Sequence, residues 1–214
     1  MYVRALEKIA SRHAPSRILS FDSVHVFKVL QLIENKGHVS RNLLCRELSL
    51  GEGSVKTLVK HLKTQGVIKT TKAGTRITSK GKKLSSQFFS AIPAEMSLSK
   101  CSVALGKFNY AVLLKQYGFA LKSGIEQRDA AIRMGAIGAT SLLFSHNSFL
   151  MPGADYDPLI KEPDTARLLL EKLKPENGDA IVIGSDMKNE RRAELAAKNA
   201  ALATIIAHEK HNPM

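Results

Sequence analysis

The sequence predicts an α+β multidomain protein, in which an N-terminal domain of helices and a β-hairpin precedes a small α/β domain. Between Val39 and Leu84, stretches with apolar residues at helical spacing lead into a β-branched stretch that a glycine interrupts. Beyond residue 100, short apolar stretches alternate with amphipathic ones. The predicted boundaries are residues 1–90 for the first domain, 91–100 for a linker and 101–214 for the second domain.

The positive charge of the chain is concentrated in its N-terminal part. Of a formal net charge of +13, residues 1–90 hold +12, with 17 Lys and Arg against 5 Asp and Glu, and residues 91–214 hold +1. A basic charge confined to one domain is typical of a protein with a polyanionic partner, and nucleic acid is the first candidate. An anionic membrane surface is the alternative, but it would favour Trp on an amphipathic helix, and the sequence has no Trp.

The first elements are a short basic stretch and two core helices. Residues 1–20 have helical apolar spacing and are expected to form a frayed basic arm, an arm that reaches along DNA, or a helix that packs against a dimer partner. Asp22 or Ser23 can cap the first core helix, which Gly37 ends, and Ser40 can cap the second. The residues expected to face the core are Val26, Val29, Leu30, Ile33, Leu43, Leu44 and Leu48.

The third core helix has one apolar and one cationic face. Residues 51–53 are expected to form the turn before it, with Ser54 as its cap. The predicted buried stripe consists of Val55, Leu58, Val59 and Leu62. The opposite face carries Lys56, Thr57, Lys60 and Thr64. A helix buried on one side and cationic on the other suits insertion into the major groove of DNA.

A β-hairpin and a further helix follow. Residues 67–71 and 76–78 are predicted strands, 72–75 their loop, and a helix is expected to begin at Thr78 or Ser79.

These residues resemble a known family. The sequence GSVKTLVKHLKTQGVI, followed by a glycine-containing hairpin and ITSKGKKL, resembles the winged helix-turn-helix transcription regulators of bacteria and archaea. The last strand of that family commonly leads into a Thr-x-x-Gly helix start. The resemblance covers about residues 20–90. The whole chain also resembles an archaeal family of uncharacterised two-domain winged-helix proteins.

Double-stranded DNA is therefore the predicted partner. The predicted contact residues are Ser54, Lys56, Thr57, Lys60, His61, Lys63, Thr64, Lys69, Lys72 and Arg76. His61 flanks this face and is either a rim contact or a half-buried packing residue. The face lacks bidentate Arg, Asn or Gln readers, which favours contact with the DNA backbone over sequence discrimination. The alternative is a solvated basic face without a function.

The second domain is expected to contain βαβ units. The predicted strands are residues 103–105, 110–114, 140–144 and 180–183, with 204–207 as a further candidate, and the predicted helices are 125–134, 164–173 and 189–202. Such alternation favours a parallel sheet covered on both faces, although the first two strands can instead pair as a hairpin and give a mixed sheet.

A weak ligand-site signal lies in the loops of this domain. Loops at the carboxyl ends of parallel strands meet in one crevice, which can hold an anion or a small molecule. The residues expected to converge there are Ser123, Gly124, Arg128, Gly184 and Ser185. The alternative for Gly184 and Ser185 is an ordinary strand-to-helix turn capped by Ser185 or Asp186, and His146 reads as a loop residue.

The sequence shows no pattern typical of catalysis, of a cofactor or of a metal site. Cys45 and Cys101 form no paired motif, and His208, Glu209 and His211 lie in a terminal tail. No leader or membrane-spanning stretch is recognisable, so we expect a cytoplasmic protein.

The sequence as a whole predicts a homodimeric DNA-binding transcription regulator whose activity a small effector in the second domain would modulate. The alternatives are a protein- or RNA-interaction module, and an enzyme on the second domain that the first domain targets to nucleic acid.

Overall fold

The computed structural model describes residues 3–11, 19–154 and 156–208, and divides into two compact units. The first unit is Met1–Phe89 and the second is Ser90–Met214. The boundary falls in the last turn of α5 (Ser79–Ala91). Glu209 and His211 of the C-terminal tail, and most of the stretch that joins the basic N-terminal segment to the first core helix, lie outside the described residues.

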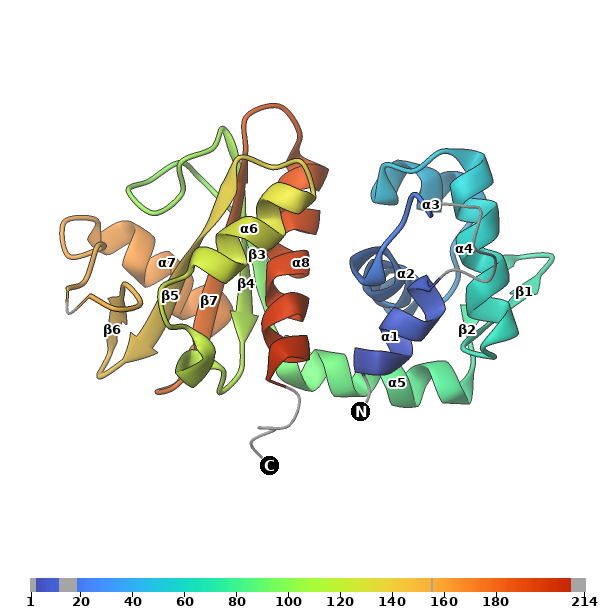
Figure 1. The fold of residues 1–214 in the computed structure, drawn as a ribbon, viewed down its shortest axis with the longest axis horizontal. Helices are drawn as coiled ribbons and strands as arrows, with labels where there is room; N and C mark the ends of the chain where they lie inside the picture. Colours follow the sequence, from blue (N-terminus) through green and yellow to red (C-terminus); the bar gives the residue numbers. More distant parts are fainter. Residues whose placement is uncertain (1–2, 12–18, 155, 209–214) are drawn as a thin grey trace. The chain divides into compact units, whose positions relative to one another are not determined.

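The N-terminal unit has the element order of a winged helix. It contains α1 (Val3–Ala10), α2 (Ser23–Lys36), α3 (Arg41–Leu48), α4 (Glu52–Thr64), β1 (Ile68–Thr71), β2 (Gly74–Ile77) and α5 (Figure 1). Strands β1 and β2 form an antiparallel hairpin, and an isolated bridge joins Val39 to Thr75 of β2. The predicted fold class, with a helical N-terminal domain and a sheet-containing domain after it, is confirmed.

The start of α4 differs from the prediction. Ser49 adopts a left-handed conformation (φ 54°), so the chain reverses directly after α3. As a result α4 begins at Glu52, with Gly51 at its N-cap position. Ser54 therefore lies inside the first turn of the helix, and the prediction that it caps α4 is wrong.

The Thr-x-x-Gly start of α5 has a physical reason. The Thr78 hydroxyl donates a hydrogen bond to the Gly66 carbonyl (2.7 Å) and accepts one from the Gly81 N–H (3.1 Å). A Cβ atom at Gly81 would collide with the carbonyl oxygen of Val67. The threonine thus caps α5 and ties it to the chain before the hairpin, and the glycine allows the close approach that this requires.

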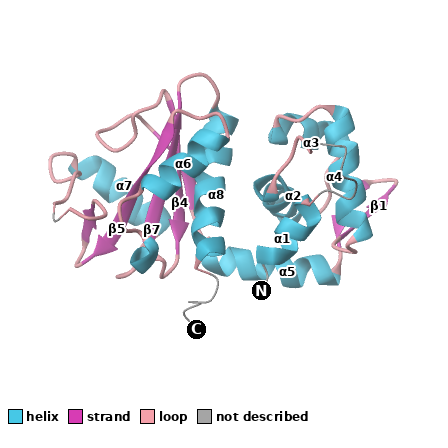
Figure 2. Ribbon diagram, viewed as in Figure 1, coloured by secondary structure: helices cyan, strands magenta, loops and turns pink. Residues whose placement is uncertain are grey.

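The C-terminal unit is built on a five-stranded sheet in the order β3-β4-β7-β5-β6, with every neighbouring pair antiparallel. The strands are β3 (Glu95–Leu98), β4 (Phe108–Leu114), β5 (Gly138–Ser145), β6 (Ser148–Leu150) and β7 (Ala180–Asp186). Helices α6 (Ile125–Arg133) and α8 (Glu190–Ala207) cover one face, and α7 (Pro163–Leu173) covers the other (Figures 1 and 2).

The expectation of a parallel sheet is wrong. Strands β4 and β5 are both antiparallel to β7, so they run in the same direction, and α6 lies between them in the chain. This is a βαβ unit, but β7 arrives from much later in the sequence and inserts between its two strands. The pairing depends on this distant strand, which local alternation of strands and helices does not reveal.

Several local predictions in this unit also need correction. The segment 91–100, expected to be a linker, contains β3, which pairs with β4. Residues 103–105 form no strand, since only an isolated bridge joins Cys101 to Ala104. Residues 204–207 are the last turn of α8, where the Thr204 hydroxyl bonds to the Ala200 carbonyl at 2.9 Å.

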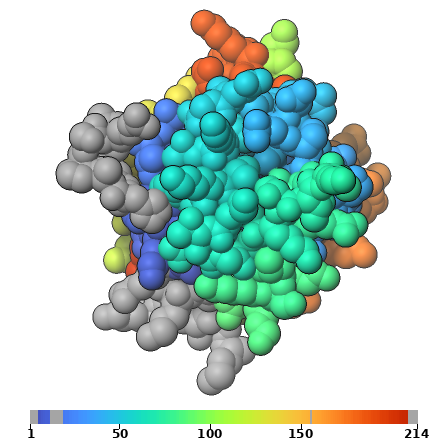
Figure 3. Space-filling view, turned by 90° about the vertical axis from the view of Figure 1, so that its right-hand side faces the viewer, coloured from blue at the N-terminus to red at the C-terminus, as the bar shows by residue number. Residues whose placement is uncertain are grey.

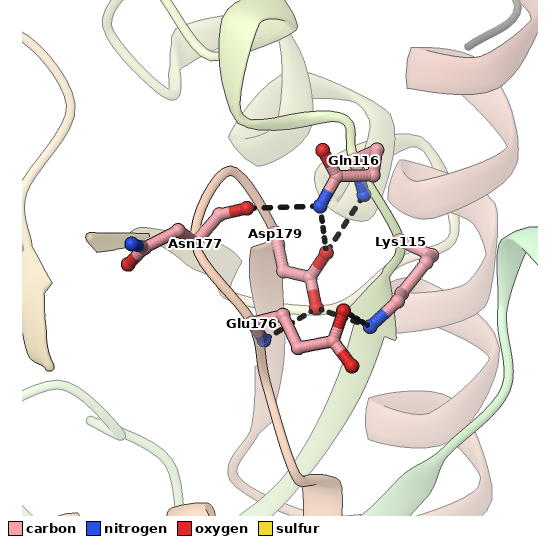
Figure 4. Close-up of polar contacts among 5 residues, drawn as sticks. All are labelled: Lys115, Gln116, Glu176, Asn177 and Asp179. Carbon is pink, nitrogen blue, oxygen red and sulfur yellow. Dashed lines mark hydrogen bonds and ion pairs between the residues drawn. The ribbon is translucent and has the colours of Figure 1, made fainter. Parts of the chain in front are cut away.

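A buried carboxylate joins the end of β4 to the start of β7 (Figure 4). Asp179 accepts hydrogen bonds from the backbone N–H groups of Gln116 and Glu176, both at 2.8 Å, and contacts the Lys115 ammonium at 3.3 Å. Burial acts to lower the pKa of Lys115, but its hydrogen bonds with Glu176 and Asp179 outweigh this and raise it. These bonds satisfy the buried charge and hold the two strand ends together.

Across residues 3–11, 19–154 and 156–208, the structure contains neither a helix long and apolar enough to cross a membrane nor a cluster of three or more potential metal-binding side chains.

Candidate nucleic-acid interface

The inner face of α4 packs on the core of the N-terminal unit. Val55, Leu58 and Leu62 are fully buried, as their spacing predicts. Val59, which the sequence placed in the same stripe, is only half-buried. The reason is its position on the helix, where it follows Leu58 by about 100° and so lies at the edge of the buried face.

The outer face of α4 forms one side of a groove. Positions 56, 59, 60, 63 and 64 follow the i, i+3, i+4, i+7, i+8 spacing of a single helical stripe. Together with Arg41 of α3 and Thr70 of β1, these residues line a groove with a volume of about 510 Å³. Figure 3 shows this side of the N-terminal unit, with α4 in teal beside α3 in blue. We call these seven residues the α4 groove.

The α4 groove is strongly cationic. Lys56, Lys60 and Lys63 project from α4 and are exposed, and Arg41 joins them from the first turn of α3. Sequence reasoning missed Arg41, because nothing in the linear pattern shows that the start of α3 lies against the middle of α4. The sequence signal that could have identified Arg41 is its place directly after the Ser40 cap, as the first residue of the helix before the turn.

The hairpin presents further cations. Lys69 and Arg76 are cross-strand partners, and Lys72 lies in the two-residue turn; all three are exposed. Because side chains alternate along a strand, Lys69 and Arg76 lie on the hairpin face opposite to Thr70. The hairpin cations therefore form a second basic surface beside the α4 groove.

His61 is not at the surface, and its prediction as a contact residue is wrong. Its side chain is buried, with Nδ1 2.8 Å from the carbonyl oxygen of Ile9 and its ring edge-on to Phe21 at 5.5 Å between centroids. The cause is α1, which packs over this side of α4. Thr57 is half-buried, and its hydroxyl bonds to the Gly53 carbonyl at 3.0 Å.

The predicted ligand crevice of the C-terminal unit does not form as expected. A Cβ atom at Gly184 would lie 2.5 Å from the Ala193 carbonyl oxygen, so this glycine serves the close packing of β7 on α8. The Ser185 hydroxyl is buried and bonds to the Asn109 side chain at 2.8 Å. Neither Ser185 nor Asp186 caps α8, since Asn189 does so.

The other three residues of that prediction lie in α6 and the loop before it, and Arg128 packs beside Gly138, the cross-strand partner of Ser185. Gly124 is the N-cap of α6 in a left-handed conformation (φ 75°), and Arg128 pairs with the neighbouring Asp129 at 3.0 Å. Ser123 is exposed in the loop before α6. The carboxyl ends of β4 and β7 do not meet as predicted, because the two strands are antiparallel and these ends lie at opposite ends of the sheet.

Comparison with known families addresses the two units separately. Residues 24–92 match the family described as the CggR N-terminal DNA-binding domain. The N-terminal unit therefore carries a winged-helix DNA-binding domain. Residues 105–205 match the family described as a domain of unknown function (DUF4443). A search of curated proteins found no match.

The architecture of the whole chain has a counterpart among solved structures. The chain is similar to the hypothetical protein PH0730 from Pyrococcus horikoshii OT3, with 26% sequence identity and a TM-score of 0.66. The similarity covers 89% of this chain and 95% of the other. The resemblance to archaeal two-domain winged-helix proteins is thus confirmed.

Proposed function

We propose that this protein is a transcription regulator that inserts α4 into the major groove of double-stranded DNA. The observation that carries the proposal is the α4 groove, in which Lys56, Lys60, Lys63 and Arg41 converge on the outer face of a DNA-binding domain. A solvated basic face needs no such convergence, because Arg41 belongs to a different helix from the three lysines.

The parts of the interface have distinct roles in this proposal. The lysines of α4 contact either the phosphates beside the major groove or the guanine edges on its floor. Arg41 stands at the N-terminus of the helix before the turn, which in helix-turn-helix proteins crosses the DNA backbone, so it binds a phosphate. Lys69, Lys72 and Arg76 of the hairpin reach phosphates or the minor groove alongside.

We further propose that the protein binds DNA as a homodimer. One recognition helix contacts few base pairs, and two of them on successive half-sites multiply the contacts. Support for pairing through the C-terminal unit comes from α6, where Ile125 and Ile132 lie two turns apart and are 50% and 47% exposed. Ligand modulation is not part of the proposal, because Gly184 serves helix packing and the Ser185 hydroxyl is engaged by Asn109.

Selection of bound sequences from random duplex DNA tests this function. We expect enrichment of a motif with two related half-sites about 10 base pairs apart, or a multiple of that spacing. Recovery of unenriched sequences would contradict a sequence-reading regulator. A single unpaired half-site would contradict the homodimer and leave DNA binding in place.

A further inference from the structure

The α4 groove contains one aliphatic side chain among its cations. Val59 lies on the same outer stripe as Lys56, Lys60 and Lys63, and it is half-buried. The core beneath α4 is filled by Val55, Leu58 and Leu62, which have essentially no exposed surface. The side of Val59 that remains accessible therefore belongs to the groove.

A valine at this place cannot bind phosphate, and its only favourable contact with DNA is apolar. In the major groove, the one apolar group on a base edge is the C5-methyl of thymine. Valine is also suited to such a contact, because its branched Cβ has one strongly preferred rotamer in a helix and presents its methyl groups at a fixed place. The surrounding lysines hold the helix against the phosphates on either side.

We infer that Val59 reads thymine through its C5-methyl group, so that the α4 groove prefers thymine at the base pair that faces Val59. The inference rests on the proposed insertion of α4 into the major groove, and it adds a base preference to a face whose lysines contact the backbone or guanine. Burial of one methyl group against Val59 corresponds to about a fourfold gain in affinity.

Two duplexes that differ only in this methyl group test the inference without an operator sequence. The probes are fluorescently labelled duplexes of roughly 21 base pairs, two turns of DNA, one of alternating dA and dT and one of alternating dA and dU. Their charge and minor-groove pattern are equal, because uracil lacks only the C5-methyl. Anisotropy titration gives the affinity of the full-length protein for each.

We expect the wild-type protein to bind the thymine duplex at least about fourfold more tightly than the uracil duplex. In Val59→Ser and in Val59→Asn, which leave no methyl group at this place, the ratio should fall toward one. Affinity for the uracil duplex should stay within about twofold, since the phosphate contacts remain. A circular-dichroism melt of each variant confirms that it is folded.

Three results would overturn the inference. Equal binding of both duplexes by the wild type would show that Val59 meets no thymine methyl, while the proposed DNA binding would stand. A thymine preference that persists in both folded variants, Val59→Ser and Val59→Asn, would place the reader elsewhere. Binding to neither duplex at low salt would overturn the proposed function itself and, with it, this inference.

Discussion

At the scale of single residues, a step of one position along α4 decides between core and surface. Lys60 projects into the α4 groove and the next residue, His61, is buried against Ile9 and Phe21. Each step rotates the side chain by about 100°, so residues at the edge of the apolar stripe have no side fixed by periodicity alone. Val59 and His61 are such residues: the sequence predicted Val59 to be buried and it is half-buried, and for His61 it left a rim contact and a packing role open. For His61, contacts with Ile9 of α1 and with Phe21 decide the side.

His25 gives the N-terminal unit a pH-dependent stability. Its Nδ1 accepts the backbone N–H of Asp22 at 3.0 Å, which requires a neutral ring. Burial lowers the pKa of His25 from its ordinary value of 6.5, and the nearby Asp22 only partly opposes this. The neutral form therefore contributes stability above pH 6.5, and this contribution is lost as the pH falls through 6.5 toward the lower folded pKa.

We expect the urea midpoint of unfolding to fall between pH 7.5 and pH 5, with a smaller fall in His25→Gln. Glutamine at this third helical position can accept the same N–H and does not titrate. Urea titrations of both proteins at the two pH values measure the difference. An equal fall in both would show that other groups cause the pH dependence.

At the scale of elements, we expect substitution by alanine to have opposite effects on stability at two glycines of the winged-helix unit. Gly81 of α5 has no room for a Cβ atom against Val67, whereas Gly53 of α4 has no atom within 4 Å of that position. Gly81→Ala should destabilise the unit by about 2 kcal/mol or more through the forced shift of α5. Gly53→Ala should stabilise it by up to about 1 kcal/mol, because alanine restricts the unfolded chain. Thermal unfolding of the two variants beside the wild type makes the comparison.

The elements that the sequence reveals are those with a strong local signal. Strands β4, β5 and β7 carry apolar runs because they lie inside the sheet, and all three were predicted. The two edge strands were missed. β3 has four residues, of which only Leu98 is buried, and β6 has three, after a turn in which His146 and Asn147 both have positive φ. An edge strand buries little, so it needs no apolar run, and its pairing is visible only in the folded sheet.

The end of α8 is a second case in which the local sequence signal differs from the structure that packing produces. Three of the four residues in its last turn, Thr204–Ala207, are β-branched, and this stretch was a candidate for a further strand. In the structure Thr204 and Ile205 are buried on the helix, and burial outweighs a local preference of a few tenths of a kcal/mol per residue. Helices α2 and α3 of the winged helix were predicted correctly because their caps, Asp22 and Ser40, are local signals, whereas the cap predicted for α4 was wrong.

At the scale of the whole molecule, the two units divide the charge unequally. The N-terminal residues hold +12 of the net +13, and the cations of the α4 groove lie within them. Affinity for DNA should therefore depend on where a lysine is removed and not only on the total charge. The C-terminal unit, close to neutral, offers exposed lysines that serve as controls, such as Lys161 and Lys172.

The most direct test is the salt dependence of DNA affinity in two charge-matched double variants. Lys56→Ala with Lys60→Ala removes two cations of the α4 groove, and Lys161→Ala with Lys172→Ala removes two from the C-terminal unit. For the first pair, the slope of log affinity against log salt should decrease in magnitude by about 2 relative to wild type, because each lost phosphate contact removes about one released counterion. The control pair should keep the wild-type slope. Equal slopes in all three proteins would contradict DNA binding through α4.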